Sequence, residues 1–167
     1  MHASYHDAEY GFPSRDDNVL LERLALEINQ AGLSWETILR KRAAFNEAFA
    51  GFDVDRVAAF GDDDVARLLG NAGIVRNRLK IAAVIDNARR IQAIRSECGS
   101  FANWLDARHP LSKAEWVALF KRTFRFTGGE ITGEFLMSLG YLDGAHEPSC
   151  PVYARILAQC PPFARKT

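Results

Sequence analysis

The sequence has few cysteines, no long apolar run and no excess of either charge. Its three cysteines, Cys98, Cys150 and Cys160, are an odd number at wide spacing, which excludes a dense disulfide framework and favours reduced thiols in the cytoplasm. The longest apolar runs are short, such as residues 81–85, whereas a bilayer-spanning helix needs about 20 apolar residues. The first residues also lack the basic and apolar segments of a signal peptide. We therefore expect a cytoplasmic protein that has no membrane partner.

The charges balance overall but are unevenly placed. The 21 basic and 21 acidic side chains give a formal net charge of zero, so no overall field attracts nucleic acid or a membrane. Residues 1–35 hold six acids and two bases, whereas residues 104–128 hold five bases and two acids. DNA binding is therefore left open, and it depends on where the basic stretch lies in the fold.

Apolar residues recur at helical spacing along the chain, and no segment alternates with period two for long enough to predict a strand. A length of 167 residues favours one domain. Spacing and capping residues predict helices at about 17–30, after Ser34, at 53–60, 62–69 and 76–97, after Ser100, after Ser112, at about 130–139 and after Pro151. We expect an all-α, compact single domain over residues 1–167, with eight or nine short helices and an unstructured N-terminal end.

Residues 124–129 separate two predicted helices and are too few for anything but a tight hairpin. Gly128 and Gly129 would allow close backbone approach and positive φ angles. The free amides at the start of the next helix can bind a phosphate oxygen, and Lys121 and Arg125 flank them. This pattern is typical of a helix–hairpin–helix element that binds the DNA backbone. The alternative is an ordinary turn whose bases are solvated.

Glu27 falls on the apolar face of the first predicted helix, in line with Leu20, Leu24 and Ala31. A carboxylate in such a place costs free energy unless it has a partner or a function. Alternatively, Glu27 lies at the edge of the apolar stripe and accepts hydrogen bonds from neighbouring amides.

The turn after this helix presents Gly32 and Leu33 as an exposed tip, and Trp35 follows. Together with Glu27, they could form a pocket of the size of a nucleobase. The alternative is that Leu33 and Trp35 are ordinary helix-packing residues.

His146 and Cys150 are separated by three residues, a spacing at which both can ligate one tetrahedral metal ion. On its own the pair indicates little, because either residue can be part of the packing or of the surface. If His6 joins the pair, the metal would tie the N-terminal segment to the C-terminal one.

Three blocks carry a resemblance to a known family: residues 5–11 (YHDAEYG), 30–42 (QAGLSWETILRKR) and 72–81 (AGIVRNRLKI). They are similar to those of the DNA-3-methyladenine glycosylase I family, and the match extends from Tyr5 to Cys150. The resemblance implies an all-helical helix–hairpin–helix glycosylase that removes 3-methyladenine from alkylated double-stranded DNA and acts as a monomer. No lysine is placed as an obvious Schiff-base nucleophile, so we expect a monofunctional enzyme.

The resemblance also implies roles for particular residues. Glu27 would hydrogen-bond the damaged base, Trp35 would stack on it, and Tyr5 and Tyr10 would complete the walls of the pocket. The residues implied to contact DNA are the tip that fills the gap in the duplex (Gly32 and Leu33) and the hairpin (Lys121, Arg125, Thr127, Gly128 and Gly129).

The chemistry of the substrate explains these residue types. The 3-methyladenine nucleotide is cationic, so its glycosidic bond is already weakened. A cation over an aromatic face gains roughly 0.5–2 kcal/mol, and a carboxylate nearby gains by ion pairing. A neutral adenine gains neither, and an unmodified base also costs more to extrude from the stack.

The sequence departs from the family pattern at several places. Tyr10 stands where the family usually has Trp, Glu130 stands where it usually has Thr, and the region 101–111 is shorter. The family has a zinc site whose Cys lies about a dozen residues before the position of His6, but only five residues precede His6 here.

We therefore expect one structural Zn²⁺ held by His6, His146 and Cys150, with His2, Cys160 or water as the fourth ligand. The departures leave two rival interpretations open. One is a non-catalytic helix–hairpin–helix DNA-binding protein derived from the family, and the other is a purely structural helical domain.

Overall fold

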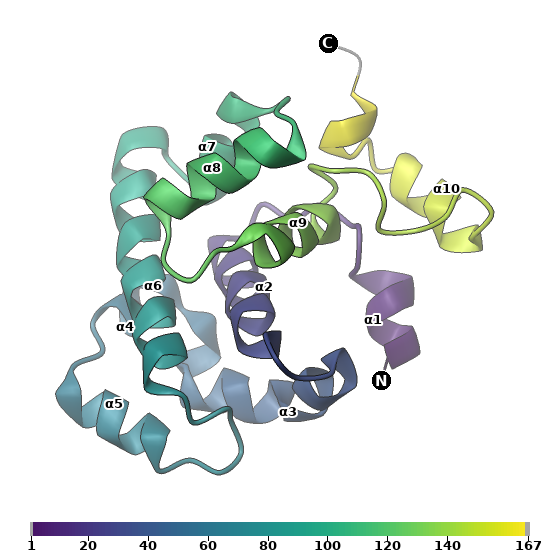
Figure 1. The fold of residues 1–167 in the computed structure, drawn as a ribbon. Helices are drawn as coiled ribbons and strands as arrows, with labels where there is room; N and C mark the ends of the chain where they lie inside the picture. Colours follow the sequence, from purple (N-terminus) through teal and green to yellow (C-terminus); the bar gives the residue numbers. More distant parts are fainter. Residues whose placement is uncertain (1, 166–167) are drawn as a thin grey trace.

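Ten α-helices and two short 3₁₀ helices form the secondary structure of residues 2–165, which are the residues that the computed structural model describes (Figure 1). The α-helices are α1 (His2–Ala8), α2 (Asp17–Gln30), α3 (Trp35–Ala48), α4 (Val54–Ala58), α5 (Asp62–Leu69), α6 (Arg78–Cys98), α7 (Phe101–Arg108), α8 (Lys113–Thr123), α9 (Gly129–Ser138) and α10 (Pro151–Leu157). The 3₁₀ helices are η1 (Ala50–Phe52) and η2 (Pro162–Ala164). The predicted all-α class is confirmed.

Side chains that the sequence singles out as caps begin the main helices. Asp16 accepts a hydrogen bond from the Asn18 amide at the start of α2. Ser112 and Glu115 bond each other's backbone amides at the start of α8, which is the predicted capping box. Each cap of this kind contributes about 1 kcal/mol to helix stability. The predicted helix boundaries are therefore close to those observed.

The N-terminal end is the main difference from the expected fold. Residues predicted to be unstructured form α1, which raises the number of α-helices above the expected eight or nine. Tyr5 is buried within it, and the helix is too short to show a clear apolar period in the sequence. The helix is held from outside, since Arg155 of α10 donates a hydrogen bond to the carbonyl of Asp7 at 3.0 Å.

Helix α2 lies at the centre of the molecule, and α3, α6 and α9 pack around it (Figure 1). Every residue from Leu20 to Asn29 is buried, so the helix has no face toward solvent over this length. A helix surrounded in this way places its few polar side chains inside the protein. Three of these, Glu22, Arg23 and Glu27, belong to the site described below.

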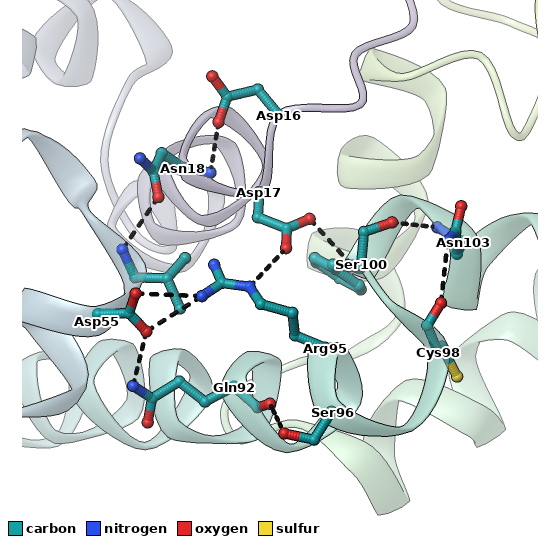
Figure 2. A network of polar contacts seen from close by, with 12 residues as sticks. Asp16, Asp17, Asn18, Asp55, Gln92, Arg95, Ser96, Cys98, Ser100 and Asn103 are labelled. Atoms are coloured by element: carbon teal, nitrogen blue, oxygen red, sulfur yellow. Dashed lines mark hydrogen bonds and ion pairs between the residues drawn. The ribbon is translucent and has the colours of Figure 1, made fainter.

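A polar network fixes the beginning of α2 (Figure 2). Arg95 of α6 donates to Asp17 of α2 at 3.2 Å and to Asp55 of α4 at 3.1 Å. The other Asp17 oxygen accepts from the Phe101 amide at the start of α7 at 2.9 Å. Because four helices meet at these groups, the network sets the direction in which the side chains of α2 point.

Among the described residues, no helix is long and apolar enough to cross a bilayer.

Candidate functional site

A cavity of about 610 Å³ opens between α1, α2, the start of α3 and the first turns of α9. This volume suits a small organic ligand such as a nucleobase. The cavity is lined by His2, Tyr5, His6, Tyr10, Glu27, Gln30, Ala31, Gly32, Trp35, Glu130, Ile131 and Glu134. The four residues that we expected to bind the base therefore share one cavity.

Glu27 is the most deeply buried acid of this cavity, with 4% of its surface exposed. No other group in residues 2–165 makes a hydrogen bond to its carboxyl group, so the alternative in which neighbouring amides satisfy it is wrong. Burial, helped by the Glu134 carboxylate and opposed by Arg23, raises the pKa of Glu27 to about 8. The cavity thus holds an acid that lacks a partner.

Aromatic side chains form the walls around Glu27. The ring centroids of Tyr5 and Trp35 are 5.2 Å apart, and those of Tyr5 and Tyr10 are 5.9 Å apart. The hydroxyl group of Tyr10 donates a hydrogen bond to Oε2 of Glu134 on α9 at 2.8 Å. A tryptophan, which the family usually has at this place, has no hydroxyl group to make this bond. Tyr10 therefore adds a hydrogen bond between the cavity wall and Glu134 that depends on the phenol hydroxyl group.

Arg23 lies one helical turn before Glu27 and is buried with it. Its Nη1 donates to the carbonyl oxygens of Phe12 at 3.2 Å and Ser138 at 2.6 Å. These bonds join the chain after α1 to the end of α9, the two segments that close the cavity around α2. Burial lowers the pKa of Arg23.

A second group of charges lies directly beside the cavity. Arg42 of α3 donates to both oxygens of Glu9, at 2.8 and 2.7 Å, and its Nε donates to Glu22 at 2.7 Å. Its guanidinium group also lies 5.9 Å from the centre of the Tyr5 ring. The hydrogen bonds from Arg42 hold the pKa of Glu9 below its usual value. In this group every acid has a cationic partner.

Hydrogen bonds from Lys80 of α6 hold the backbone at the start of the turn between α2 and α3. Gly32 has a φ of 83°, a conformation that favours glycine, and Leu33 at the tip is 39% exposed. Lys80 of α6 is buried, and its ammonium group donates to the carbonyls of Asn29 at 3.1 Å and Ala31 at 2.7 Å. A cation at the end of a helix is favourable because the carbonyl groups there carry partial negative charge.

The connection between α8 and α9 differs from the sequence expectation in its backbone. The left-handed residue is Phe126, with a φ of 61°, and neither Gly128 nor Gly129 has a positive φ. A Cβ atom on either glycine would meet nothing within 4 Å, so both face open space. No side chain caps the first turn of α9, which leaves its amide groups available.

The predicted DNA contacts near this connection differ in their surroundings. Lys121 is exposed and has no ion pair within the described residues, whereas Arg125 is paired with Asp86. Thr127 is buried, and its hydroxyl group donates to the carbonyl of Phe120 at 3.0 Å. The expectation that Thr127 faces DNA is corrected for its side chain, which shapes the connection from inside.

His6, His146 and Cys150 come together although the chain separates them widely. Their ligand atoms all lie within 4.8 Å of one another. Nε2 of His146 is bonded to the carbonyl of Tyr10 at 2.7 Å, which leaves Nδ1 facing the Cys150 sulfur at 3.7 Å. Two imidazoles and a thiol are ligands that zinc prefers, and a backbone carbonyl on the second ring nitrogen is a usual support. The residues therefore fit a zinc ion.

The expected fourth ligands are not part of this cluster. Neither His2 nor Cys160 belongs to it among the residues that the structure describes. His2 lines the cavity instead, and Cys160 is exposed. Water is the remaining one of the three alternatives.

Sequence reasoning missed Glu134, Arg23 and Arg42 as part of the site. Glu134 follows Ile131 by three residues on α9, a spacing that puts both on one face of a helix. That spacing was the available signal, but it could not show that this face of α9 meets α2. Glu130, which stands where the family usually has Thr, has a side chain that is 93% exposed, and its carboxylate lies 3.9 Å from the Lys113 ammonium group.

Comparison with known proteins gives consistent matches along the chain. The family model described as methyladenine glycosylase matches residues 1–110. The DNA-3-methyladenine glycosylase 1 of Escherichia coli is 36% identical over 172 residues, which cover 92% of this chain and 91% of that protein. The DNA-3-methyladenine glycosylase of Haemophilus influenzae is 34% identical over 171 residues, which cover 90% of this chain and 91% of that protein.

Solved structures match equally well. A crystal structure of 3-methyladenine DNA glycosylase I superimposes with a TM-score of 0.78 at 36% identity, covering 89% of this chain and 92% of that one. The Staphylococcus aureus 3-methyladenine DNA glycosylase I, solved to explain recognition of 3-methyladenine, gives a TM-score of 0.81 at 32% identity, with 90% of each chain covered.

Proposed function

The chain belongs to the methyladenine glycosylase family, and from this premise we propose that it hydrolyses the N-glycosidic bond of 3-methyladenine in double-stranded DNA. The observation that carries the proposal is Glu27, a deeply buried carboxyl group without a hydrogen-bonding partner in an aromatic-walled cavity. A burial of this kind is costly unless a ligand supplies the missing partner.

The cavity supports recognition of a base that has left the DNA stack. A 3-methyladenine nucleotide brings a positive charge and ring N–H groups, and Glu27 can accept from those groups and oppose that charge. Trp35 and Tyr5 offer faces on which a cationic ring is favoured. The base is already a good leaving group, so the residues of the cavity have to bind and orient it more than they have to protonate it.

Some of the DNA contacts that we propose lie next to the lining of the cavity, since Leu33 follows Gly32 and the first turn of α9 contains Glu130. Leu33 at the tip of the turn would fill the space that the extruded base leaves in the duplex. The uncapped amides of α9 and the unpaired Lys121 would bind backbone phosphates. Contacts to backbone phosphates position the duplex without reading its sequence, as suits a repair enzyme.

We also propose a structural zinc ion on His6, His146 and Cys150. It would supply folding free energy by tying α1 to the loop before α10, which keeps Tyr5 against the cavity. Hydrolysis of this glycosidic bond does not call for a metal, so the ion has no step in it. Metal analysis is the test, with Cys150→Ser expected to lose the zinc and Cys98→Ser, outside the cluster, expected to keep it. Less than a tenth of an equivalent in the wild type, with His6→Ala leaving stability unchanged, would reject the site.

The activity is tested by the release of free 3-methyladenine from methylated duplex DNA. We expect release by the wild type and by Glu47→Gln, an exposed carboxylate outside the cavity, and a large loss in Glu27→Gln. If the wild type binds duplex DNA but releases no alkylated base, the enzyme proposal fails and the non-catalytic DNA-binding protein is favoured. If it neither releases a base nor binds DNA at low salt, the structural domain is favoured.

A further inference from the structure

Glu134 places a second carboxylate in the cavity that contains Glu27. It comes from α9, and its Oε2 accepts the hydrogen bond from the Tyr10 hydroxyl group at 2.8 Å. Neither carboxylate takes part in an ion pair with any residue from 2 to 165. Arg23, the buried cation that acts on Glu27, directs hydrogen bonds to backbone carbonyls instead.

The two acids therefore line one partly buried cavity, and neither has an ion pair with a cationic side chain among the described residues. The groups that face Glu27 are Arg23 on its own helix, Tyr5 and Tyr10 at α1, and Glu134 on α9. Only one of these four is cationic, and Glu134 makes ionisation of Glu27 harder. The basic side chains among the described lining residues are His2 and His6, and neither a lysine nor an arginine is among them.

The Tyr10 hydroxyl group fixes the position of the Glu134 carboxyl group. It donates a hydrogen bond to Oε2 and so holds that oxygen at a defined place on the wall. Glu134 is only half-buried, whereas Glu27 is almost fully buried. The cavity therefore presents one acid that a neighbouring hydroxyl group orients and a second, deeper acid that has no hydrogen bond from any residue between 2 and 165.

We propose that Glu134, positioned by Tyr10, is a specificity-determining residue that makes the cavity select purine bases carrying a positive charge over neutral ones of the same shape. The inference rests on the proposed function and adds a residue to it. A cationic ring in the cavity is attracted to the Glu134 carboxylate and lowers the cost of ionising Glu27, so that both acids can act on it. A neutral ring leaves that cost unchanged, so the second acid discriminates by charge where the aromatic walls discriminate by shape.

Binding of two free bases separates charge from shape. The probes are the 3,9-dimethyladeninium ion, which carries a permanent positive charge, and 3-methyladenine at pH 7.5, which is neutral. Affinities are measured through the fluorescence of Trp35 at the cavity wall. In Glu134→Gln we expect the affinity for the cation to fall about tenfold or more and that for the neutral base to change by less than about twofold. Glu47→Gln, outside the cavity, is expected to leave both affinities unchanged.

Tyr10→Phe provides a second variant in case Glu134→Gln folds poorly. It removes the hydroxyl group that holds Glu134 and keeps the ring, so we expect a smaller loss for the cation and again little change for the neutral base. Equal losses of both probes in these variants would show a packing role and overturn the inference. Unchanged affinity for the cation in Glu134→Gln would overturn it as well.

The pH profile of base release gives an independent readout. Removing the Glu134 charge makes Glu27 easier to ionise, so the acidic limb of the profile should move to lower pH in Glu134→Gln. A limb that stays in place contradicts the inference. The binding assay needs no hydrolysis, so charge selection without release of any base would reject the proposed function alone. Release of 3-methyladenine without charge selection would reject the present inference alone.

Discussion

Two pairs of acids lie near each other around α1 and α2, and they differ in whether a cation of the protein pairs with them. Glu9 and Glu22 are held by Arg42 through hydrogen bonds of 2.7 to 2.8 Å. Glu27 and Glu134 share a cavity and have no cation between them. The same few helices thus build one carboxylate pair that is complete in the free protein and another that is not.

The pKa values follow this difference. The hydrogen bonds from Arg42 lower the pKa of Glu9, whereas burial raises the pKa of Glu27 to about 8. An acid that has its partner inside the protein contributes to the fold. An acid that is buried without one weakens the fold, and it is complementary to a cation that comes from outside. The difference predicts that Glu9 and Glu22 are structural acids and that Glu27 and Glu134 are functional ones.

The largest effect is expected for Glu27→Gln. Base release should fall about 30- to 1,000-fold, which corresponds to roughly 2–4 kcal/mol of transition-state stabilisation. The free energy of unfolding should stay the same or rise at pH 7, since a neutral amide does not have to take up a proton on folding, as the buried Glu27 does. Single-turnover release and chemical denaturation measure the two quantities. A variant that loses stability and keeps its rate would reverse the assignment of the two pairs.

The opposite result is expected for Arg42→Met. The substitution leaves Glu9 and Glu22 without a partner and keeps most of the side-chain packing. Since Arg42 is 25% exposed, we expect a loss of about 2 kcal/mol in the free energy of unfolding, below the 3–5 kcal/mol of a fully buried pair. The matched control is Arg40→Met on the same helix, exposed and without an ion pair in the described part of the chain. Equal stability of the two variants would show that the Arg42 bonds contribute nothing.

The two pairs also predict opposite slopes of stability against pH. The pKa of Glu27 is raised in the folded state, so its contribution to stability is present below about pH 4.5 and is lost as the pH rises toward 8. The pKa of Glu9 is lowered, so its contribution is present at neutral pH and is lost as the pH falls through the folded value. Each unit of pKa difference corresponds to about 1.4 kcal/mol.

Comparing denaturation of the wild type and Glu27→Gln between pH 5 and 8 isolates the first slope. The difference between the two proteins should shift by roughly 3 kcal/mol in favour of the variant as the pH rises, because most of the interval between the unfolded and folded pKa values of Glu27 lies in this range. A constant difference over this range would mean that Glu27 ionises normally in the folded protein.

The smallest effects concern the cations, where the same distinction between paired and unpaired groups applies. Lys121 has no ion pair with any residue from 2 to 165, so Lys121→Gln should weaken binding to all DNA sequences alike and reduce the slope of log affinity against log salt by about 1. Arg125→Gln should change the slope less, because Asp86 already partners the guanidinium group. Binding of lesion-containing and undamaged duplexes at several salt concentrations measures both. A loss confined to one base context would contradict phosphate contacts at these residues.

The sequence could predict most of the fold because local signals decide most of it. Capping residues such as Asp16 and Ser112 mark helix starts directly. Helix α1 was missed, since its seven residues are held by contacts with α10 that no local pattern reveals. The left-handed residue before α9 is Phe126 although two glycines lie close by. Its neighbours are held by contacts that no local pattern reveals, since Asn87 bonds the backbone of Arg125 and the Thr127 hydroxyl group bonds the Phe120 carbonyl.

The cavity could be predicted only in part. Glu27 broke an apolar stripe and therefore stood out, whereas Glu134 lies on a helix whose neighbour is fixed only by tertiary packing. His6, His146 and Cys150 could be grouped from the resemblance, and the structure gives their closeness. The metal, the individual DNA contacts, the cytoplasmic location and the monomeric state stay predictions.

Lys80 has a consequence for the way in which the tip of the turn would enter DNA. Its ammonium group ties the carbonyls of Asn29 and Ala31, the two residues on either side of Gln30, before any duplex is present. A flexible loop would have to give up many conformations on insertion, at roughly 1–2 kcal/mol per backbone residue. Leu33 is attached to backbone that is already ordered, so most of this conformational entropy is lost when the protein folds. Little would remain to be lost each time the tip enters the duplex.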